Sequence, residues 1–213
     1  MKNKLFVLTI FLIFLFWFKI LPKNNQFELP KYVPADLKAT LVHPSLVGKT
    51  EHFIPEFSFV NQNGVVINQK YMDNKIYVAN FFFTSCPSIC IDLTNNLKLI
   101  QEEFADNNDI FILSHSVDPS TDTIERLKKY EKINQINGKN WFLLRGEIND
   151  IVEIAQFGYF AIASSDLLVE DSLIHTENFV LIDKNKQIRG VYNGTSKLEM
   201  SYLIDDIKTL QSN

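Results

Sequence analysis

The chain has 213 residues, of which 46% are apolar and 22% are charged, and its formal net charge is −4. This length fits one globular domain with additional segments, large enough to bury a core without disulfide staples. The sequence has no basic block and no glycine-rich phosphate loop, and its two cysteines are too few for a disulfide-dense scaffold. We therefore expect no nucleic acid partner.

The N-terminus carries a hydrophobic segment. Residues 1–4 are short and basic, and residues 5–21 are apolar apart from Thr9 and Lys19. A helix that spans a bilayer needs about 17–25 residues, so this segment is short but sufficient. No small-residue cleavage site follows it, which favours an uncleaved membrane anchor over a cleaved signal peptide. We expect the N-terminus in the cytoplasm and the rest of the chain exported.

Residues 22–49 lack a clear period and contain Pro30, Pro34 and Pro44. This composition is typical of a tether that holds a domain away from the membrane. An ordered arm packed against the domain is the alternative for its C-terminal part.

The domain itself is expected over residues 50–213, with alternating strand and helix patterns. Its expected order is a hairpin (57–60 and 65–68), a buried strand (75–83), a helix from Pro87 to 104, a buried strand (110–117), a helix opened by a capping box at Asp122 and Glu125 and ending near 133, a strand (141–144), a helix (149–159), a loop (161–174), a hairpin (179–183 and 187–192) and a helix (196–210). This order predicts an α/β, thioredoxin-like three-layer fold with an added N-terminal hairpin and a single membrane anchor before it.

The only two cysteines, Cys86 and Cys90, lie at the transition from a buried strand to a helix. Four positions apart on a helix, they would share one face, and a helix N-terminus favours thiolate over thiol. Right-handed crossovers place such a pair at the carboxyl edge of the sheet. Three interpretations follow: two small buried hydrophobes, a pair that undergoes disulfide exchange, or a metal site of soft thiolates.

Two features separate these interpretations. Redox enzymes of this fold usually have two residues between the cysteines and a cis-proline before the second hairpin, whereas here three residues intervene and the last proline is Pro119. The segment before that hairpin instead contains His175. Two thiolates and one imidazole suit Cu(I), or Zn(II) with a fourth ligand. The other histidines are poorly placed: His43 in the tether, His52 before the first hairpin, and His115 in a strand, where packing is expected.

Three stretches together resemble the Sco/SenC family of membrane-anchored copper-binding assembly proteins: FFFTSCPSIC (81–90), SVDPSTDT (116–123) and IHTENFVLIDKNKQI (174–188). The similarity extends from about Phe53 to the C-terminus. It implies a thioredoxin fold, a site for a copper ion, Cu(I) or Cu(II), at Cys86, Cys90 and His175, and a role in building the binuclear copper centre of cytochrome c oxidase. The chain departs from the family at Ser88 and Ile91, where many members have aspartate and proline.

Three acidic residues near these motifs have two interpretations each. Asp118 matches a family motif but is better explained as a strand end near a helix start. Asp171 and Glu177 are solvated loop charges or, alternatively, groups that orient the imidazole of His175.

The sequence thus predicts a copper chaperone, and not an enzyme, anchored in a bacterial inner membrane with its domain on the periplasmic side. Its expected partner is the copper-bearing subunit of a respiratory cytochrome c oxidase or another copper protein. The alternative is a thiol–disulfide reductase with Cys86 and Cys90 as its redox pair, which keeps the copper-ligand cysteines of the oxidase reduced. A peroxiredoxin-like peroxidase is disfavoured because the Pro-x-x-x-Thr-x-x-Cys pattern is absent.

Overall fold

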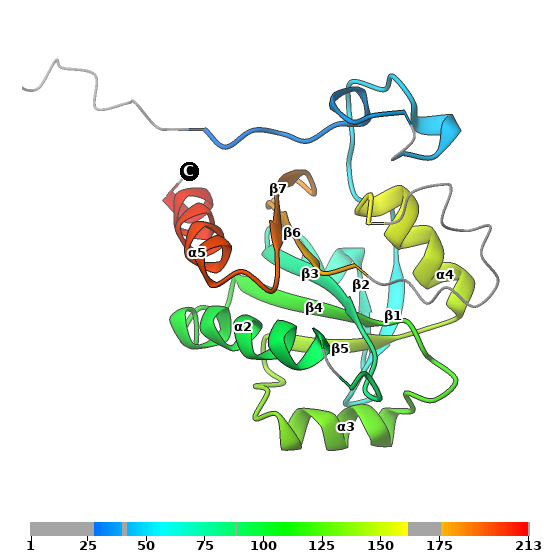
Figure 1. Cartoon of the computed structure of the whole chain (residues 1–213), viewed down its shortest axis with the longest axis vertical. Helices are drawn as coiled ribbons and strands as arrows, with labels where there is room; N and C mark the ends of the chain where they lie inside the picture. The colour runs from blue at the N-terminus through cyan, green and yellow to red at the C-terminus, as the bar shows by residue number, and fades with distance from the viewer. Residues whose placement is uncertain (1–27, 40–41, 88, 162–175, 213) are drawn as a thin grey trace, which may run out of the picture.

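The structure is a computed structural model that describes residues 28–39, 42–87, 89–161 and 176–212. Its centre is a mixed sheet of seven strands in the order β2-β1-β5-β4-β3-β6-β7 (Figure 1). The strands are β1 (Ser58–Asn61), β2 (Val66–Asn68), β3 (Ile76–Phe82), β4 (Ile110–Ser116), β5 (Trp141–Arg145), β6 (Asn178–Ile182) and β7 (Ile188–Asn193).

The middle of the sheet is parallel and its margins are antiparallel. β3, β4 and β5 pair in parallel, whereas β1–β2, β1–β5, β3–β6 and β6–β7 are antiparallel. Every residue of β3 and β4 is buried, as the continuous apolar runs predict for strands covered on both faces. Phe82 at the end of β3 lies opposite Ser116 at the end of β4. The loops that follow these two strands therefore leave the sheet at the same edge.

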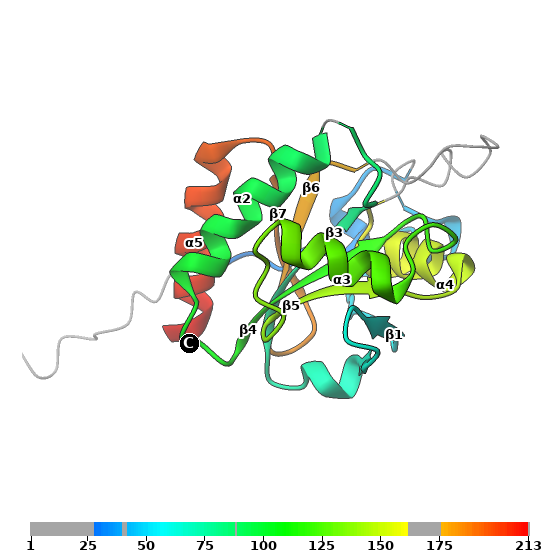
Figure 2. The same ribbon diagram turned by 90° about the horizontal axis from the view of Figure 1, so that it is seen from below.

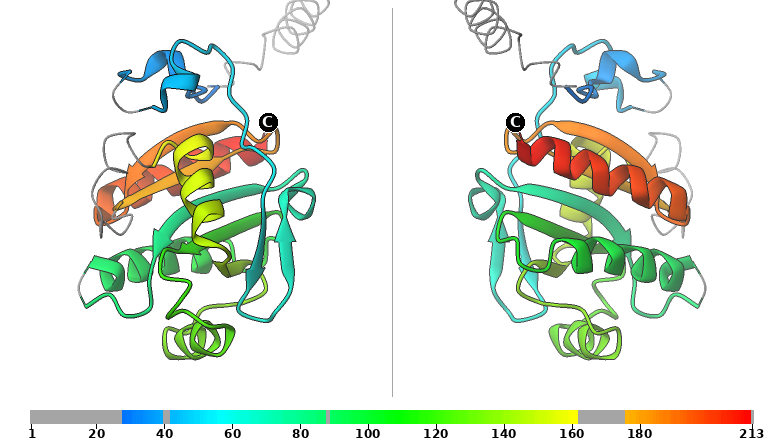
Figure 3. Two further views of the ribbon diagram at one scale, coloured as in Figure 1. Left: turned by 90° about the vertical axis from the view of Figure 1, so that its right-hand side faces the viewer. Right: turned by 90° about the vertical axis from the view of Figure 1, so that its left-hand side faces the viewer.

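Helices cover both faces of the sheet. They are α2 (Ile89–Glu103), α3 (Ile124–Ile133), α4 (Ile148–Glu153), which continues as a π-helical turn η4 (Ile154–Gly158), and α5 (Lys197–Ser212). Short 3-10 turns are η1 (Pro34–Asp36), η2 (Pro44–Leu46) and η3 (Gln69–Met72). α4 lies on one side of the sheet and α2 and α5 on the other (Figures 2 and 3). The result is three layers, as the order of elements predicted.

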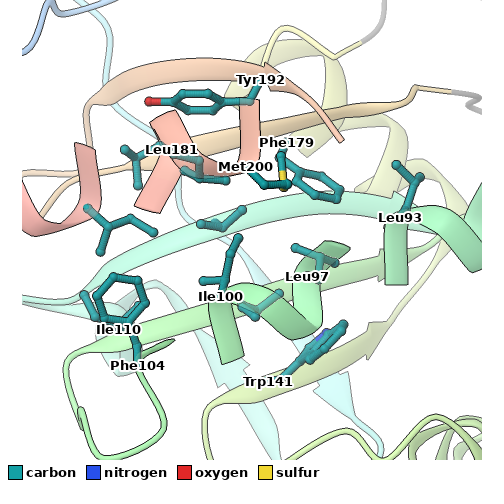
Figure 4. Close-up of a cluster of buried hydrophobic side chains, with 14 of the residues drawn as sticks. Leu93, Leu97, Ile100, Phe104, Ile110, Trp141, Phe179, Leu181, Tyr192 and Met200 are labelled. Carbon is teal, nitrogen blue, oxygen red and sulfur yellow. The ribbon is translucent and has the colours of Figure 1, made fainter. Parts of the chain in front are cut away.

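Alternation along the strands divides the core into two clusters. One lies beneath α2, α3 and α5, where Leu97 lies near Trp141 of β5 and Met200 lies beside Phe179 of β6 (Figure 4). The other lies beneath α4 and is rich in aromatic rings, among them Phe81 and Tyr159. Burial of such side chains contributes about 1.5–3 kcal/mol each before the entropy of ordering is subtracted.

The described part of the segment before the domain lies against the sheet edge at β7. Leu29 is buried in the core, and the Tyr32 amide donates to the Ile188 carbonyl over 2.9 Å. Arg189 is buried, forms an ion pair with Asp183 over 2.7 Å and donates to the Leu29 carbonyl. An ordered arm therefore occupies part of the stretch for which the sequence predicts a tether.

The predicted anchor, residues 5–21, lies outside the described residues. Among the helices that the structure does describe, none combines the length and the apolar character needed to cross a bilayer.

Candidate metal centre

Cys90 is held by a regular element. It lies in the first turn of α2, is 5% exposed and belongs to the core cluster that includes Phe82 and Leu93. Its sulfur position follows from the helix and from the packing of that helix on the sheet.

Cys86 is held differently, because it precedes the helix. α2 begins at Ile89, so the prediction of a helix from Pro87, with both cysteines on one helical face, is wrong. The Cys86 amide instead donates to the Phe83 carbonyl over 3.2 Å, which closes a turn directly after β3. Both cysteines are present as thiols, and Cys86 contributes to the electrostatic surroundings of Cys90. The two side chains therefore lie near each other even though one helix does not carry both.

The electrostatic surroundings of Cys90 favour the neutral thiol. Its pKa is raised to about 12, first of all by burial and next by the neighbouring Cys86 thiol. The charge of Asp122 contributes to this rise, and a backbone hydrogen bond at Phe83 partly opposes it. At Cys90 the raised pKa runs against the expectation that a helix N-terminus favours the thiolate, and burial is its main cause. A cation that binds here must displace the thiol proton.

A hollow of about 350 Å³ opens beside Cys90. Its apolar walls come from the end of β3 and the start of α2: Phe81, Phe82, Phe83, Ile89 and Leu93. The remaining walls are Ala161 and residues 176–178, which flank the stretch outside the described residues. His175 belongs to that stretch, and its neighbour Thr176 lines the same hollow as Cys90.

A buried carboxylate lies behind the turn that carries Cys86. Asp122 has no exposed surface and accepts hydrogen bonds from the Thr84 amide over 3.2 Å and from Ser116 Oγ over 2.5 Å. The predicted capping box at Asp122 is wrong: Thr123 is the N-cap of α3 and accepts from the Arg126 amide over 3.2 Å. Asp122 therefore points to the dithiol turn and not along its own helix.

Two residues of α3 complete these surroundings. Arg126 Nε donates to Thr84 Oγ1 over 2.6 Å, and the Tyr130 hydroxyl bonds to Thr94 Oγ1 over 2.8 Å. Burial raises the pKa of Tyr130, and the nearby cysteines add to this shift. Sequence reasoning missed Asp122, Arg126 and Tyr130. The one available signal was Asp122, the second aspartate of the SVDPSTDT stretch, and its position before a predicted helix indicated a helix cap.

The other histidines lie elsewhere, as predicted. His43 accepts a hydrogen bond from the Ser45 amide, and His52 bonds to the Gly158 carbonyl over 2.7 Å. His115 is fully buried on β4 and packs against the rings of Phe59 and Phe81.

Asp118 behaves as the end of a strand. Its carboxylate accepts from Ser120 Oγ over 2.8 Å and from the Thr121 amide over 3.2 Å. Slight burial opposes ionisation, but these hydrogen bonds hold the pKa of Asp118 below its ordinary value.

The carboxylate of Glu177 accepts from Asn193 Nδ2 over 2.9 Å at the start of β6. Ile91, where the family often has proline, is 55% exposed. Ser88, Asp171 and His175 lie outside the described residues. Within the described part of the chain, no three side chains of the metal-binding types converge.

A protein-family model for SCO1/SenC matches residues 47–212. The chain belongs to the SCO1/SenC family. The SCO1 protein homolog of Bacillus subtilis is 30% identical to it over 162 residues, which cover 73% of this chain and 81% of that relative. The resemblance found in the sequence is therefore confirmed.

Solved structures of the family share the fold. BsSco, a Sco-family cytochrome c oxidase assembly protein with an identified disulfide switch, superposes with a TM-score of 0.66 at 28% identity, over 76% of this chain and 95% of that one. Copper-bound ScoI of Arabidopsis thaliana superposes with a TM-score of 0.59 at 22% identity, over 76% of this chain and 99% of that one. These matches confirm the predicted mixed α/β, thioredoxin-like fold.

Proposed function

We propose that this chain is a copper chaperone that binds one copper ion through the thiolates of Cys86 and Cys90 and the imidazole of His175. It passes the ion to the binuclear copper centre of a respiratory cytochrome c oxidase. Family membership supports this function, since a related member is a cytochrome c oxidase assembly protein and another has been solved with copper bound.

The hollow beside Cys90 is the observation that supports the ligand set. Thr176 lines it together with Cys90, and Thr176 is the residue that follows His175 in the chain. Two soft thiolates with one imidazole form a donor set that suits Cu(I).

Transfer of the copper ion is possible because its proposed ligands lie in different kinds of element. Cys90 belongs to a helix and Cys86 to a turn fixed on the sheet, whereas His175 lies outside regular elements in the sequence pattern. Replacement of one ligand by a ligand of the acceptor opens a route for transfer of the ion. Residues 5–21 would anchor the chain in a bacterial inner membrane, with the domain on the periplasmic side.

The decisive experiment measures copper content and affinity in the full-length chain, purified in detergent and kept reduced without oxygen. Wild type is expected to bind one Cu(I) per chain. Cys86→Ser is expected to lose tight binding. His175→Ala is expected to weaken binding by at least about 10–100-fold, because removal of a group that only orients a metal ligand already costs that much. His43→Ala is the control histidine and should bind like wild type. Wild type that takes up no copper refutes the proposal, and unchanged affinity in His175→Ala refutes the part assigned to that residue.

A thiol–disulfide reductase is the second candidate, favoured by the proximity of the two thiols and by the disulfide switch identified in BsSco. A thiolate of one cysteine attacks the target disulfide, and the other cysteine resolves the mixed disulfide. The target leaves with two thiols and this chain with a Cys86–Cys90 disulfide, which a cellular thiol reductant must reduce again. Exchange activity that survives His175→Ala, in protein that carries no copper when isolated from cells, favours this role over delivery.

A further inference from the structure

The two cysteines need different kinds of support, and only one kind is visible from the secondary structure. Cys90 is fixed by α2, but Cys86 lies in the turn of residues 83–86, before the helix begins. A turn of this length has few bonds of its own that keep its shape. The position of the Cys86 sulfur therefore depends on what holds Thr84, two residues earlier.

Asp122 holds Thr84 from behind. Both carboxylate oxygens lie within hydrogen-bond distance of the Thr84 amide, at 3.2 and 3.4 Å, and one of them accepts from the Thr84 hydroxyl. Ser116 Oγ donates to the same carboxylate over 2.5 Å. Hydrogen bonds to a buried charge are about twice as strong as neutral ones, so this arrangement resists displacement of the turn.

Two arginines hold Asp122 further, one at its carboxylate and one at its backbone. Arg126 Nε lies 3.8 Å from Asp122 Oδ1 and also donates to Thr84 Oγ1 over 2.6 Å. Arg145 of β5 donates to the Asp122 carbonyl over 3.0 Å. Asp122 thus links the ends of β3 and β4, the start of α3 and the end of β5 at the edge of the sheet where the dithiol lies.

A role in the fold alone explains this placement poorly. The edge would be stabilised as well by apolar side chains, since a buried charge costs desolvation free energy that its partners only offset. The carboxylate bonds to Thr84, 38 residues away in sequence and next to the site. Its charge also influences Cys90.

We propose that Asp122 is a positioning residue: by binding the amide and hydroxyl of Thr84 it fixes the turn that presents Cys86, and so sets the geometry in which the two sulfurs meet a soft metal ion or each other. Arg126 supports it by neutralising the carboxylate from the solvent side and by bonding to the same hydroxyl. The identity of the metal ion in this inference rests on the proposed function, whereas the fixed turn rests on the hydrogen bonds described above.

The test uses the full-length chain in detergent and four variants. Thr84→Val removes the hydroxyl and keeps the shape of the side chain, whereas Thr84→Ser keeps the hydroxyl. Asp122→Asn removes the charge and one acceptor oxygen. Glu125→Gln is the matched control, because it removes an exposed carboxylate from the first turn of the same helix.

Cu(I) affinity is measured by competition with a chromophoric Cu(I) chelator. Thr84→Val and Asp122→Asn are expected to bind at least about tenfold more weakly than wild type, the loss typical of groups that orient metal ligands. Thr84→Ser and Glu125→Gln should bind Cu(I) like wild type. In protein loaded with Cu(II), the thiolate-to-Cu(II) absorption band should shift only in Thr84→Val and Asp122→Asn. A residue that merely stabilises the fold would leave the band and the affinity of the folded protein unchanged.

The proposal is overturned if folded Thr84→Val binds copper as wild type does, or if Thr84→Ser binds as weakly as Thr84→Val. Should Asp122→Asn fail to fold, the Thr84 pair decides alone. If wild type binds no copper, the proposed function fails. The positioning role is then tested by the midpoint potential of the Cys86–Cys90 disulfide. A tenfold loss in disulfide stability raises its midpoint potential by about 30 mV in Thr84→Val. An unchanged potential there overturns the inference.

Discussion

The two faces of the sheet differ in how their buried polar side chains are paired. Beneath α2, α3 and α5, the buried polar side chains are paired: Trp141 Nε1 donates to Ser114 Oγ, which donates to Asn80, and Asn96 Nδ2 donates to the Gly194 carbonyl. Beneath α4, both ring nitrogens of His115 lack a hydrogen-bond partner among the described residues. Aromatic rings surround that histidine.

This difference follows the location of the site. A network of buried hydrogen bonds favours one arrangement, because any shift of an element breaks several of them at once. The dithiol lies at the end of this face, where a small displacement would separate the two sulfurs. The opposite face carries no proposed ligand, and a buried histidine there reduces stability without disturbing the site.

The largest expected effect on the free energy of unfolding comes from the apolar packing beneath α2, α3 and α5, the face at whose end the two cysteines lie. Leu97 of α2 is 1% exposed, and Leu97→Ala should lower the free energy of unfolding by about 2–5 kcal/mol, since it leaves a cavity between the helix and the sheet. Leu99 lies on the same helix but is 40% exposed, so Leu99→Ala should change it by less than about 0.5 kcal/mol. Urea unfolding of the two variants measures the difference. Equal losses would show that α2 is not held by its buried side.

The next effect probes the opposite face through pH. Burial lowers the pKa of His115 from 6.5 to about 3, so between these values the unfolded chain binds a proton that the folded chain does not. The free energy of unfolding therefore falls as the pH falls through this window, by about 1.4 kcal/mol per pH unit. Relative to its value at pH 7, wild type should lose about 2 kcal/mol more than His115→Leu by pH 5.

Unfolding in urea at pH 7 and pH 5 tests this, since other titrating groups are common to both chains. The same pH dependence in His115→Leu as in wild type would show that the ring is paired or hydrated in the folded chain.

These two faces also show what sequence reasoning can reach. Strands, helices and their order could be predicted because apolar periodicity is a local property, and the dithiol at the end of β3 could be found because the chain has only two cysteines. The family resemblance added the copper site, which composition and spacing had left open between metal binding and disulfide exchange.

Other features depend on contacts between distant residues. Asp122 has the sequence signature of a helix cap, yet it binds Thr84 because β3 and β4 end side by side. The start of α2 was placed two residues too early, since Pro87 suits a first helical turn and nothing local reveals the turn closed at Phe83. The raised pKa of Cys90 follows from burial, which a helix N-terminus in sequence does not disclose.

The smallest expected effect separates the two ties that α3 makes around the dithiol. Tyr130→Phe removes the hydroxyl that bonds to Thr94 and should lower the free energy of unfolding by about 0.5–1.5 kcal/mol. It leaves the Asp122–Thr84 contact in place, so its Cu(I) affinity should fall by less than the roughly tenfold expected of Thr84→Val. Chelator competition on both variants decides between two mechanisms. Equal losses would mean that docking of α3 as a whole sets the geometry of the sulfurs, whereas a loss confined to Thr84→Val locates that control in the turn before Cys86.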